Sequence, residues 1–400
     1  MIAAAFWVAV TLIVYTYAGY PLLVFLLSRV RRPRPERTPF LPPLTVVIAA
    51  WNEEAVIARK LEETLGLGYP PHLLQVIVAA DGSDDATAAI AGRYADRGVL
   101  VLHRPERAGK LAAITRAVGH ATGDVIVFSD ANNSYRAGAL HAMAAPFADP
   151  TVGVVSGRKI VVEDDGLGYS EGLYWRYESA LKEWESRLGC CIGVNGEIIA
   201  VRRQLFSAPP PGVINDDSWL ARLALRRGDR IVYAKDAVSV ERVSAEPADE
   251  IERRTRMFAG QWQTWGRLRS EIPWKRPVVT WQLFSHKLLR PLLPFWMATA
   301  AVTGVLALFF PGDGHGTAAP LTLAAPWNWA LLSAQAAFYA LAVAGGRLTG
   351  KIGKIAFVPR FLLNANWASL RGLHRHLTGT QTALWQRVAR RDDSPATGRT

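Results

Sequence analysis

The sequence contains very little cysteine: Cys190 and Cys191 are the two cysteines among 400 residues. Neighbouring residues cannot readily close a relaxed disulfide, and two sulfur atoms alone do not make a zinc site. The composition therefore excludes a disulfide framework, and a zinc site would need other ligands. We expect both side chains to pack as small apolar groups, which suits a reducing cytoplasm.

Positive charge is missing from the first segment of the chain, because no Lys or Arg precedes Arg29. A secretory signal would have a basic start and an apolar stretch of about 7 to 15 residues, and this segment has neither. Instead, Ile2 to Leu27 is almost continuously apolar and exceeds the roughly 20 helical residues that cross a hydrocarbon core. We therefore expect a transmembrane helix over residues 1–30.

Basic residues crowd the end of this helix and the chain directly after it: Arg29, Arg31, Arg32, Arg34 and Arg37. Lys and Arg mark the cytoplasmic side of a membrane segment, so Met1 is expected outside and the following chain inside. Residues 31–43 then form a basic linker that its prolines make stiff. Such flanking runs account for the net charge of +12, which indicates a lipid bilayer as partner and argues against nucleic-acid binding.

The C-terminal part of the chain, residues 271–371, is expected to return to the membrane. Two stretches, about 291–310 and 327–345, are apolar, and each has basic residues on one side only. The connection Pro311–Pro326 contains no Lys or Arg. The distribution of charge thus predicts two transmembrane helices joined by an outside loop.

A third apolar stretch, about 355–371, is less regular, since Arg360, Asn364 and Asn366 interrupt it. Burying those polar groups in lipid would cost more than leaving them at the membrane surface. We therefore expect an interfacial or re-entrant helix here. Residues 372–400 follow as a basic cytoplasmic tail.

Residues 44–270 alternate short apolar stretches with helical ones. This alternation predicts an α/β domain whose first strands form a parallel sheet of the nucleotide-binding kind. A mixed second portion would supply room for an acceptor. The expected strands are 44–49, 74–80, 99–103, 125–128, 152–159, 198–201 and 230–234, and the expected helices are 53–65, 85–95, 110–121, 172–187 and 217–227.

The most informative stretch covers residues 124–135. Val125–Phe128 is too short for a helix and fits a parallel strand buried on both faces. The strand would lead into Asp130, and ligands of open α/β sheets lie at the carboxyl ends of strands. Asp130 and Asn132 offer hard oxygens to a divalent ion that bridges a diphosphate. An Asp/Asn-rich turn without a ligand is the alternative interpretation.

Polar residues also follow the two earlier strands of the predicted sheet. Glu54 comes after the first strand, and Asp81 ends the second, where its carboxylate could accept hydrogen bonds from a nucleotide. Residues 83–85 are expected mainly to cap the next helix. A basic glycine loop, 104–110, opens the following helix and could hold a phosphate or sugar through Lys110 and backbone N–H groups.

Seven motifs occur in a fixed order: Pro43 to Glu54, Asp81-Gly82-Ser83-x-Asp85, Arg107-Ala-Gly-Lys110, Asp130-Ala-Asn132, Gly193-Val-Asn-Gly196, Asn215-Asp216-Asp217-x-x-Leu220 and Arg253-Arg-x-Arg256. Their order and spacing resemble the membrane-bound family 2 glycosyltransferases. Those enzymes are GT-A fold relatives of the cellulose, hyaluronan and poly-N-acetylglucosamine synthases. The resemblance covers nearly the whole chain and implies a Rossmann-like GT-A catalytic domain on the cytoplasmic side.

The resemblance also implies roles for the residues at the strand ends. Glu54 and Asp81 would hold the uridine part of a nucleotide sugar, and Lys110 would reach the donor. Asp130 and Asn132 would bind the diphosphate and a metal, Mg²⁺ or Mn²⁺. The chain departs from the family at two of these motifs, because Asn132 and Ala80 stand where many relatives have Asp. A further residue of the shared motifs, Asn195, is expected to contact the substrate.

The catalytic base is expected in the next motif of the series. Inverting transfer needs a carboxylate that takes the proton from the acceptor hydroxyl as it attacks the anomeric carbon. Asp217 occupies the position of the family's base, with Leu220 three residues on, and Asp216 takes the preceding acidic place. The alternative is that Asn215 and the two aspartates merely cap a helix.

Two arginines complete the expected site. Residues 253–262 are similar to the Gln-x-x-Arg-Trp region of processive synthases, and this implies that Arg254 and Arg256 bind the leaving nucleotide diphosphate. A basic face on solvent or anionic lipid is the alternative. Met257 replaces the Trp that offers processive relatives a stacking platform, although Trp262 or Trp265 could substitute. This departure argues against polymer synthesis.

Together these features predict an inverting glycosyltransferase that moves a sugar from a nucleotide-diphosphate donor, a UDP-sugar, to a membrane-associated acceptor. A lipid-linked acceptor and a growing polysaccharide both stay open. A processive synthase with coupled secretion would have accessory subunits of an export system as partners. A non-catalytic nucleotide-sugar-binding membrane subunit is the alternative from another class. The expected location is the inner (plasma) membrane, crossed several times, with the catalytic domain cytoplasmic.

Overall fold

The computed structural model describes residues 1–30, 40–162, 166–242, 247–266, 272–348 and 350–382. The chain forms two compact units. The sheet unit comprises Val24–Glu250 and Gly266–Gln282, and the helical unit comprises Met1–Leu23, Ile251–Trp265 and Leu283–Thr380. Most of the predicted linker and of the predicted tail lies outside the described residues.

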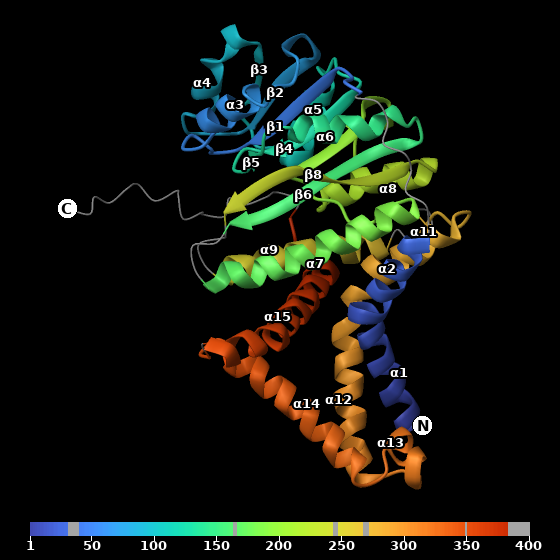
Figure 1. Cartoon of the computed structure of the whole chain (residues 1–400). Helices are drawn as coiled ribbons and strands as arrows, with labels where there is room; N and C mark the ends of the chain where they lie inside the picture. The colour runs from blue at the N-terminus through green and yellow to red at the C-terminus, as the bar shows by residue number, and fades with distance from the viewer. Residues whose placement is uncertain (31–39, 163–165, 243–246, 267–271, 349, 383–400) are drawn as a thin grey trace, which may run out of the picture. The chain divides into compact units, whose positions relative to one another are not determined.

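One eight-stranded sheet organises the sheet unit, with the strand order β3-β2-β1-β4-β7-β6-β8-β5 (Figure 1). The first four strands of that order are parallel neighbours, as the sequence predicts. Every residue of β1 is buried, because a central strand with helices on both faces has no exposed side. The strands are β1 (Leu44–Ala50), β2 (Leu74–Asp81), β3 (Val99–Arg104), β4 (Val125–Asp130), β5 (Ser134–Tyr135), β6 (Val152–Val162), β7 (Ile198–Arg202) and β8 (Arg230–Arg242).

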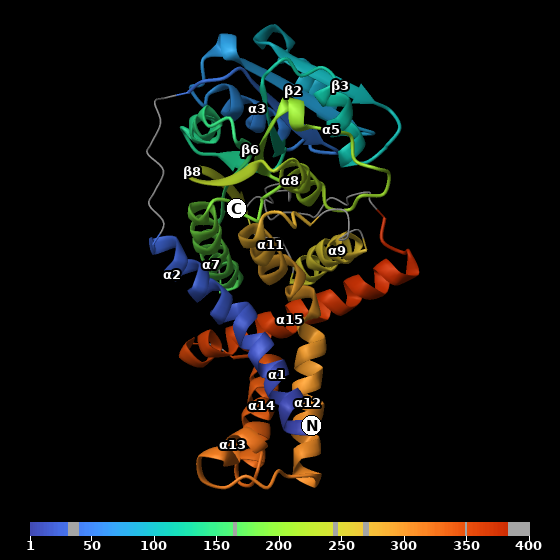
Figure 2. The same cartoon turned by 90° about the vertical axis from the view of Figure 1, so that its right-hand side faces the viewer.

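Helices pack on this sheet. In its parallel half, α3, α4 and α5 begin after the short turns that follow β1, β2 and β3. α5 packs on β1 and β2, and α7 packs on β6 and β8. Both views of the ribbon show α7 beside β6 and β8 (Figures 1 and 2). The helices of this unit include α3 (Ile57–Leu65), α4 (Thr87–Gly92), α5 (Lys110–Val118), α6 (Ala139–Ala144), α7 (Gly166–Leu188) and α8 (Asp216–Arg227).

The second half of the sheet is mixed, as predicted, but it contains elements that the prediction lacks. β7 pairs antiparallel with both β4 and β6, so the two halves form one continuous sheet. The short β5 and the helix α6 are absent from the prediction. β8 continues to Arg242 instead of ending near Ala234, with a register shift against β6 between Gly157 and Arg158. Exposed Lys235 and Asp236 interrupt its apolar pattern and conceal the continuation.

The helical unit contains the apolar ends of the chain. Two helices, Ile2–Val30 and Pro277–Phe309, are long and apolar enough to cross a membrane, although part of each belongs to the sheet unit. The first consists of α1 (Ile2–Val14), a π-helical turn and α2 (Tyr20–Val30), and the second ends in α12 (Leu293–Phe309). Phe6 and Ala9 of α1 pack on Ala300 and Ala307 of α12.

Four further α-helices lie in the described part of this unit: α9 (Pro247–Trp265), the short α13 (Ala319–Thr322), α14 (Trp327–Ala344) and α15 (Gly350–Thr378). α14 forms over the predicted range, and its crossing of a membrane stays a prediction. The stretch predicted as an interfacial or re-entrant segment is part of α15, a single helix with Pro359 inside. Glu252 of α9 binds Arg371 and Arg375 of α15, which joins these two helices.

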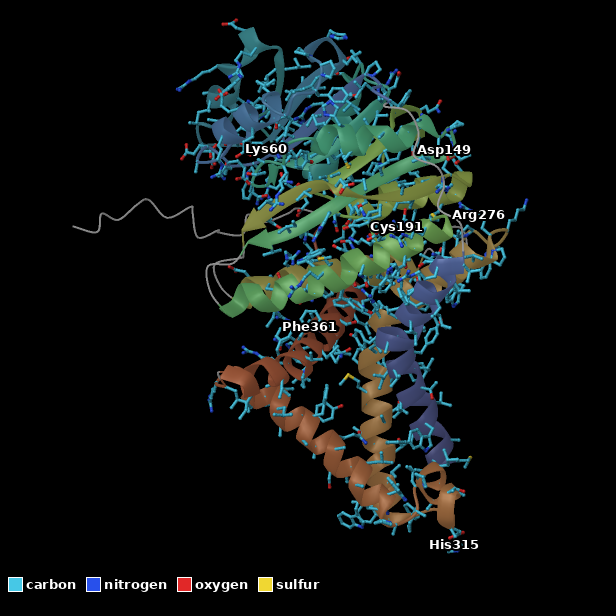
Figure 3. The ribbon with its side chains drawn as sticks, in the orientation of Figure 1. Lys60, Asp149, Cys191, Arg276, His315 and Phe361 are labelled. Carbon is cyan, nitrogen blue, oxygen red and sulfur yellow. The ribbon has the colours of Figure 1, made fainter. Side chains whose placement is uncertain are left out.

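Both cysteines behave as predicted. Cys190 and Cys191 are free and buried in the sheet unit, where Figure 3 marks Cys191. Burial raises the pKa of Cys190 to about 11 and that of Cys191 well above its ordinary value. Since the thiolate is the reactive form, neither side chain is a nucleophile at neutral pH.

Candidate active site

The turns after β1 and β2 are joined by a set of short hydrogen bonds. The Asn52 side chain donates to Asp84 Oδ1 over 2.6 Å, and its Oδ1 accepts from the Asp84 N–H. Glu54 is exposed, and its Oε2 accepts from the Ala86 N–H at 3.0 Å. Asp84 therefore links two turns, and Asp85 does so too, because it accepts from the Glu54 N–H at 3.1 Å as well as from the N–H of Thr87 at the start of α4. The capping prediction thus fits Asp85 in part and is wrong for Ser83 and Asp84, which bond to Asn52.

Asp81 anchors the basic loop before α5. Its carboxylate is fully buried and accepts from the N–H groups of Ala108, at 3.0 Å, and Gly109, at 2.7 Å. Gly82 has φ +67°, and a Cβ there would lie 2.7 Å from the Arg107 nitrogen, so only glycine fits this approach. Asp81 thus fixes the loop, and its contact with a nucleotide stays a prediction.

Three predicted residues meet at the carboxyl edge of the sheet. Lys110, the first residue of α5, places its Nζ 2.7 Å from Asp130 Oδ1 and 3.1 Å from Asp216 Oδ2. β4 brings Asp130 to this point and α8 brings Asp216. The Asp130 side chain is 37% exposed, and those of the other two are each 19% exposed. The cluster therefore combines fixed charge with access from solvent.

The charges in this cluster shift one another. Burial alone would lower the pKa of Lys110, but the two carboxylates raise it above its ordinary value. Withdrawal from water alone would raise the pKa of Asp130, but Lys110 holds it below its usual range. Lys110 is therefore a cation and Asp130 an anion throughout the neutral range.

Asp217 lies beside this cluster in sequence, on the first turn of α8. Its Oδ1 accepts from the Ser218 N–H at 2.6 Å, and its Cβ lies 3.2 Å from where a Cβ of Gly196 would be. Asn215 is the N-cap residue and makes no side-chain capping bond, while Asp216 binds Lys110. Capping therefore does not account for the whole acidic motif.

Asn132 and Asn195 have different surroundings. Asn132 is partly exposed on the turn after β4. Asn195 is 7% exposed; its Oδ1 accepts from Lys182 Nζ, and its amide donates to the Gly157 carbonyl at 2.8 Å. These bonds hold the segment before β7 against α7 and β6. The predicted contact of Asn195 with substrate remains a prediction.

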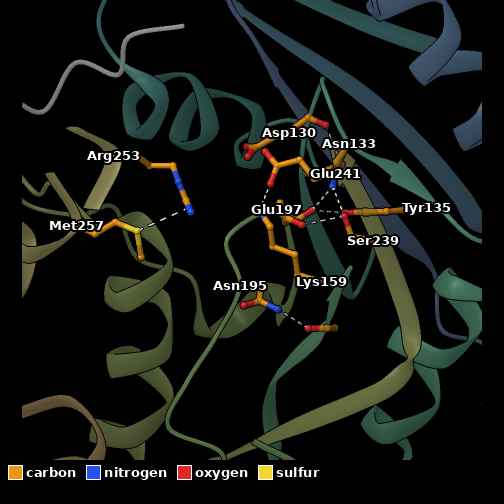
Figure 4. Close-up of polar contacts among 12 residues, drawn as sticks. Asp130, Asn133, Tyr135, Lys159, Asn195, Glu197, Ser239, Glu241, Arg253 and Met257 are labelled. Carbon is orange, nitrogen blue, oxygen red and sulfur yellow. Dashed lines mark hydrogen bonds and ion pairs between the residues drawn. The ribbon is translucent and has the colours of Figure 1, made fainter. Parts of the chain in front are cut away.

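A buried network that the sequence analysis missed lies behind Asp130 (Figure 4). Asn133 Oδ1 accepts from Lys60 Nζ at 2.6 Å, and Asn133 Nδ2 donates to the Glu197 carbonyl at 2.9 Å. Lys159 forms ion pairs with the carboxylates of Glu197 and Glu241. Burial lowers the pKa of Lys60 to about 7, although the charge of Asp130 opposes that shift.

A signal for Lys60, labelled in Figure 3, is present in the sequence of α3. Lys60 recurs at helical spacing with Ile57, Leu61 and Thr64, and all four are buried. A lysine on the apolar face of an amphipathic helix must find buried partners, because an unpaired buried charge is costly. That position identifies Lys60 as a residue with a specific partner in the core.

The predicted diphosphate-binding arginines belong to the helical unit. The Arg254 guanidinium lies over the ring of Phe361 of α15, 4.6 Å from its centroid. Trp262 is buried and donates from its ring nitrogen to the Ser369 carbonyl at 3.2 Å. Trp262 therefore packs between helices instead of offering an open stacking face. The roles of Arg254 and Arg256 in binding the leaving group stay predictions.

Comparison with known proteins identifies the class to which this fold and site belong. A family model described as glycosyl transferase family 2 matches residues 45–205, which include β1 to β7 and the Asp130 turn. The chain thus contains a family 2 glycosyltransferase domain over these residues, as the motifs predict.

Several individual proteins resemble the chain over most of its length. It is 25% identical over 331 residues to an N-acetylglucosaminyltransferase of Rhizobium meliloti, covering 74% of this chain and 70% of the relative. It is 27% identical over 333 residues to a beta-monoglucosyldiacylglycerol synthase of Synechocystis, covering 76% and 67%. The solved mannosyltransferase PcManGT of Pyrobaculum calidifontis, in complex with GDP-Man and Mn²⁺, has a TM-score of 0.69 and 24% identity, covering 95% and 100%. That likeness supports a GT-A-like fold.

Proposed function

We propose that the chain is an inverting glycosyltransferase that moves a sugar from a nucleotide-diphosphate donor, a UDP-sugar, to a membrane-associated acceptor. The observation that carries this proposal is the cluster of Lys110, Asp130 and Asp216 at the carboxyl edge of the sheet. Asp217 follows Asp216 directly in the sequence. An open α/β sheet binds its ligands at this edge. Lys110 supplies a cation for the diphosphate, Asp130 a carboxylate for the metal, and Asp217 a carboxylate for the proton of the acceptor.

The donor set fits a divalent metal, Mg²⁺ or Mn²⁺, held by Asp130 and Asn132. The described residues contain no group of three or more His, Cys, Asp and Glu side chains that could hold a metal. A site with one carboxylate and one amide leaves positions for phosphate oxygens and water, which is how Mg²⁺ is usually bound with nucleotides. When bound, the metal offsets the charge of the diphosphate as it leaves.

The residues of the chain divide the remaining work. The acceptor oxygen attacks the anomeric carbon from the face opposite the diphosphate, Asp217 takes the hydroxyl proton, and the nucleoside diphosphate leaves with the electron pair of the broken bond. Asp216 and Asp130 hold the Lys110 ammonium, which attracts the diphosphate. Because the bond forms on the face opposite the one that breaks, the anomeric configuration inverts.

A lipid acceptor is favoured over a growing polysaccharide. Met257 stands where processive relatives have a stacking Trp, and Trp262 is buried between helices. The name of the Synechocystis relative, a beta-monoglucosyldiacylglycerol synthase, supports a diacylglycerol-type acceptor. A single transfer at the membrane surface agrees with both points.

The proposal is tested with purified full-length protein in detergent. UDP- and GDP-sugars are supplied with diacylglycerol or an oligosaccharide, with and without Mn²⁺, and nucleoside diphosphate release and glycolipid formation are measured. We expect metal-dependent transfer of one sugar to the lipid. Binding of a nucleotide sugar without release of nucleoside diphosphate under any of these conditions would instead identify a binding-only subunit.

We also propose that the chain crosses the inner membrane three times, with the catalytic domain in the cytoplasm. The Lys- and Arg-free connection between α12 and α14 supports an outside position for residues 311–326. A cysteine at His315, which is exposed, should react with a membrane-impermeant thiol reagent in intact cells, and one at Thr400 should react only after lysis. Gly314 is a poorer choice, because a Cβ there would lie 2.1 Å from Thr322 Oγ1.

The labelling has low background, since both native cysteines are buried. Protection of the His315→Cys side chain together with labelling of Thr400→Cys in intact cells would reverse the proposed orientation. Labelling of both positions from outside would remove one of the proposed membrane crossings.

A further inference from the structure

The turn from Asp130 to Asn133 is fixed at two ends by different means. At its start, Asp130 pairs with Ala49 in the parallel ladder of β1 and β4. At its end, the Asn133 side chain is 2% exposed and uses both of its polar atoms. Oδ1 accepts from Lys60 and from Ser129 Oγ at 3.1 Å, and Nδ2 donates to the Glu197 carbonyl and to Ser239 Oγ at 2.8 Å. The turn is therefore held at Asp130 by the sheet and at Asn133 by side-chain hydrogen bonds.

Lys60 forms two hydrogen bonds with Asn133. Its Nζ donates to Asn133 Oδ1 and also to the Asn133 carbonyl at 2.9 Å, so it holds both the side chain and the backbone at this position. The ammonium lies 4.2 Å from the centroid of the Tyr135 ring, which supplies a further favourable contact for a cation. The Lys60 side chain is 2% exposed.

A buried lysine on the apolar face of α3 lowers the stability of the fold relative to an apolar residue, because its amine must leave water. Methionine would fill a similar volume without withdrawing an amine from water, and stability alone would favour the apolar residue. Buried polar networks in which every member is satisfied fix one arrangement of the chain. The arrangement fixed here is the turn that carries Asp130 and Asn132.

We propose that Lys60 and Asn133 are positioning residues that hold the turn Asp130–Asn133 in the shape required to bind the donor diphosphate with its metal. This inference rests on the function proposed above. Lys60 orients the Asn133 amide, because Nζ donates to the oxygen on that side, and the amide nitrogen then faces Glu197 and Ser239. Loss of Lys60 frees the amide and the backbone of the turn, so Asp130 and Asn132 lose their common geometry.

The test compares Lys60→Met with Thr45→Val in the full-length protein. UDP binding is measured by calorimetry over a range of Mn²⁺ concentrations, and thermal unfolding is recorded for each variant. We expect Lys60→Met to raise the Mn²⁺ concentration for half-maximal UDP binding by about tenfold, since bonds to charged groups are among the stronger ones.

Thr45→Val is the matched control at the opposite end of β1. The Thr45 hydroxyl is buried, donates to Gln75 Oε1 at 2.7 Å and accepts from the Gly123 N–H at 2.9 Å. Its loss should lower the unfolding temperature and leave the Mn²⁺ dependence at the parental value. An equal rise in the Mn²⁺ requirement of both variants would show general loosening and overturn the positioning role.

A second, milder variant covers the case in which Lys60→Met does not fold. Ser239→Ala lies on β8 and removes one acceptor of the Asn133 amide, together with the donor to Glu197 Oε1 at 3.0 Å. Ser239 takes no part in the ion pairs of Lys110. The variant should raise the Mn²⁺ requirement about threefold, because the Asn133 amide keeps its bonds to Lys60 and to the Glu197 carbonyl. Parental Mn²⁺ dependence in every folded variant would overturn the inference alone, whereas a parent protein that binds neither UDP nor GDP would overturn the proposed function and this inference with it.

Discussion

Asp217→Asn is expected to lower turnover by about 10² to 10⁴, the usual contribution of a general base, and to leave donor affinity almost unchanged. The substitution keeps the size of the side chain and an oxygen that can accept from the Ser218 N–H, so the start of α8 should stay intact. Turnover and donor affinity are measured separately, by single-turnover transfer and by calorimetry with UDP. A loss confined to turnover identifies Asp217 as the group that takes the proton.

Asp216→Asn is the matched comparison on the neighbouring residue. Asp216 pairs with Lys110, so its loss should weaken donor binding through the cluster as well as reduce turnover. Near-parental turnover in Asp217→Asn with the full loss in Asp216→Asn would move the base to Asp216. Near-parental turnover in both would favour a different base or a binding-only domain.

Asp130→Ala is expected to abolish donor binding and turnover together. Asp130 is the strongest metal ligand available at the end of β4 and one of the two partners of Lys110. Removing it leaves the diphosphate without its metal and releases Lys110 toward Asp216. Binding of UDP with and without Mn²⁺ and transfer by the same preparation are the measurements.

Asp124→Ala provides the control for this experiment. Asp124 is exposed immediately before β4, at the other end of the same strand, and its main chain forms hydrogen bonds with Pro43 and Arg203. It should behave like the parent protein. If Asp130→Ala bound UDP as tightly as the parent, with unchanged dependence on Mn²⁺, Asp130 would be a turn residue and the metal would be held elsewhere.

The parallel half of the sheet is predictable because its strands are buried on both faces. Stretches such as Val125–Phe128 stand out as apolar segments too short for a helix, and polar residues end them. The same reasoning placed Asp130 at the end of its strand and Lys110 after the third strand, whereas Asp216 was named from the family resemblance alone. The structure brings these three together. The carboxyl edge of the sheet lies where its parallel strands end, and the apolar stretches of the sequence show where that is.

The second half of the sheet is less legible because its pairing depends on distant segments. β5 is two residues long and gains its only described sheet partner from β8, so no local pattern marks it. β8 passes through exposed Lys235 and Asp236 at an irregularity against β6. A strand that changes exposure along its length has no constant alternation to detect.

The buried network of Lys60 and Asn133 escaped prediction for another reason. Charged and amide residues are usually exposed, and their types alone suggest a solvated surface. The partners of Asn133 come from β4, from the segment before β7 and from β8, so only the assembled sheet defines them. The helical periodicity of α3 indicates that Lys60 is buried, but not what it binds.

The position of β4 in the sheet has a consequence for the order in which the enzyme folds. Its partner β1 precedes it in the chain, whereas its other partner β7 follows only after β6 and α7. Closing a longer loop costs more entropy before the ladder forms, so β1 to β4 should pair first, already during synthesis. Hydrogen exchange during refolding should then protect β1 and β2 before β6 and β8. Asp130 would reach its place early, whereas Glu197 and Ser239 would fix the turn after it last. A nascent chain would therefore position the Asp130 carboxylate before it could bind the donor diphosphate.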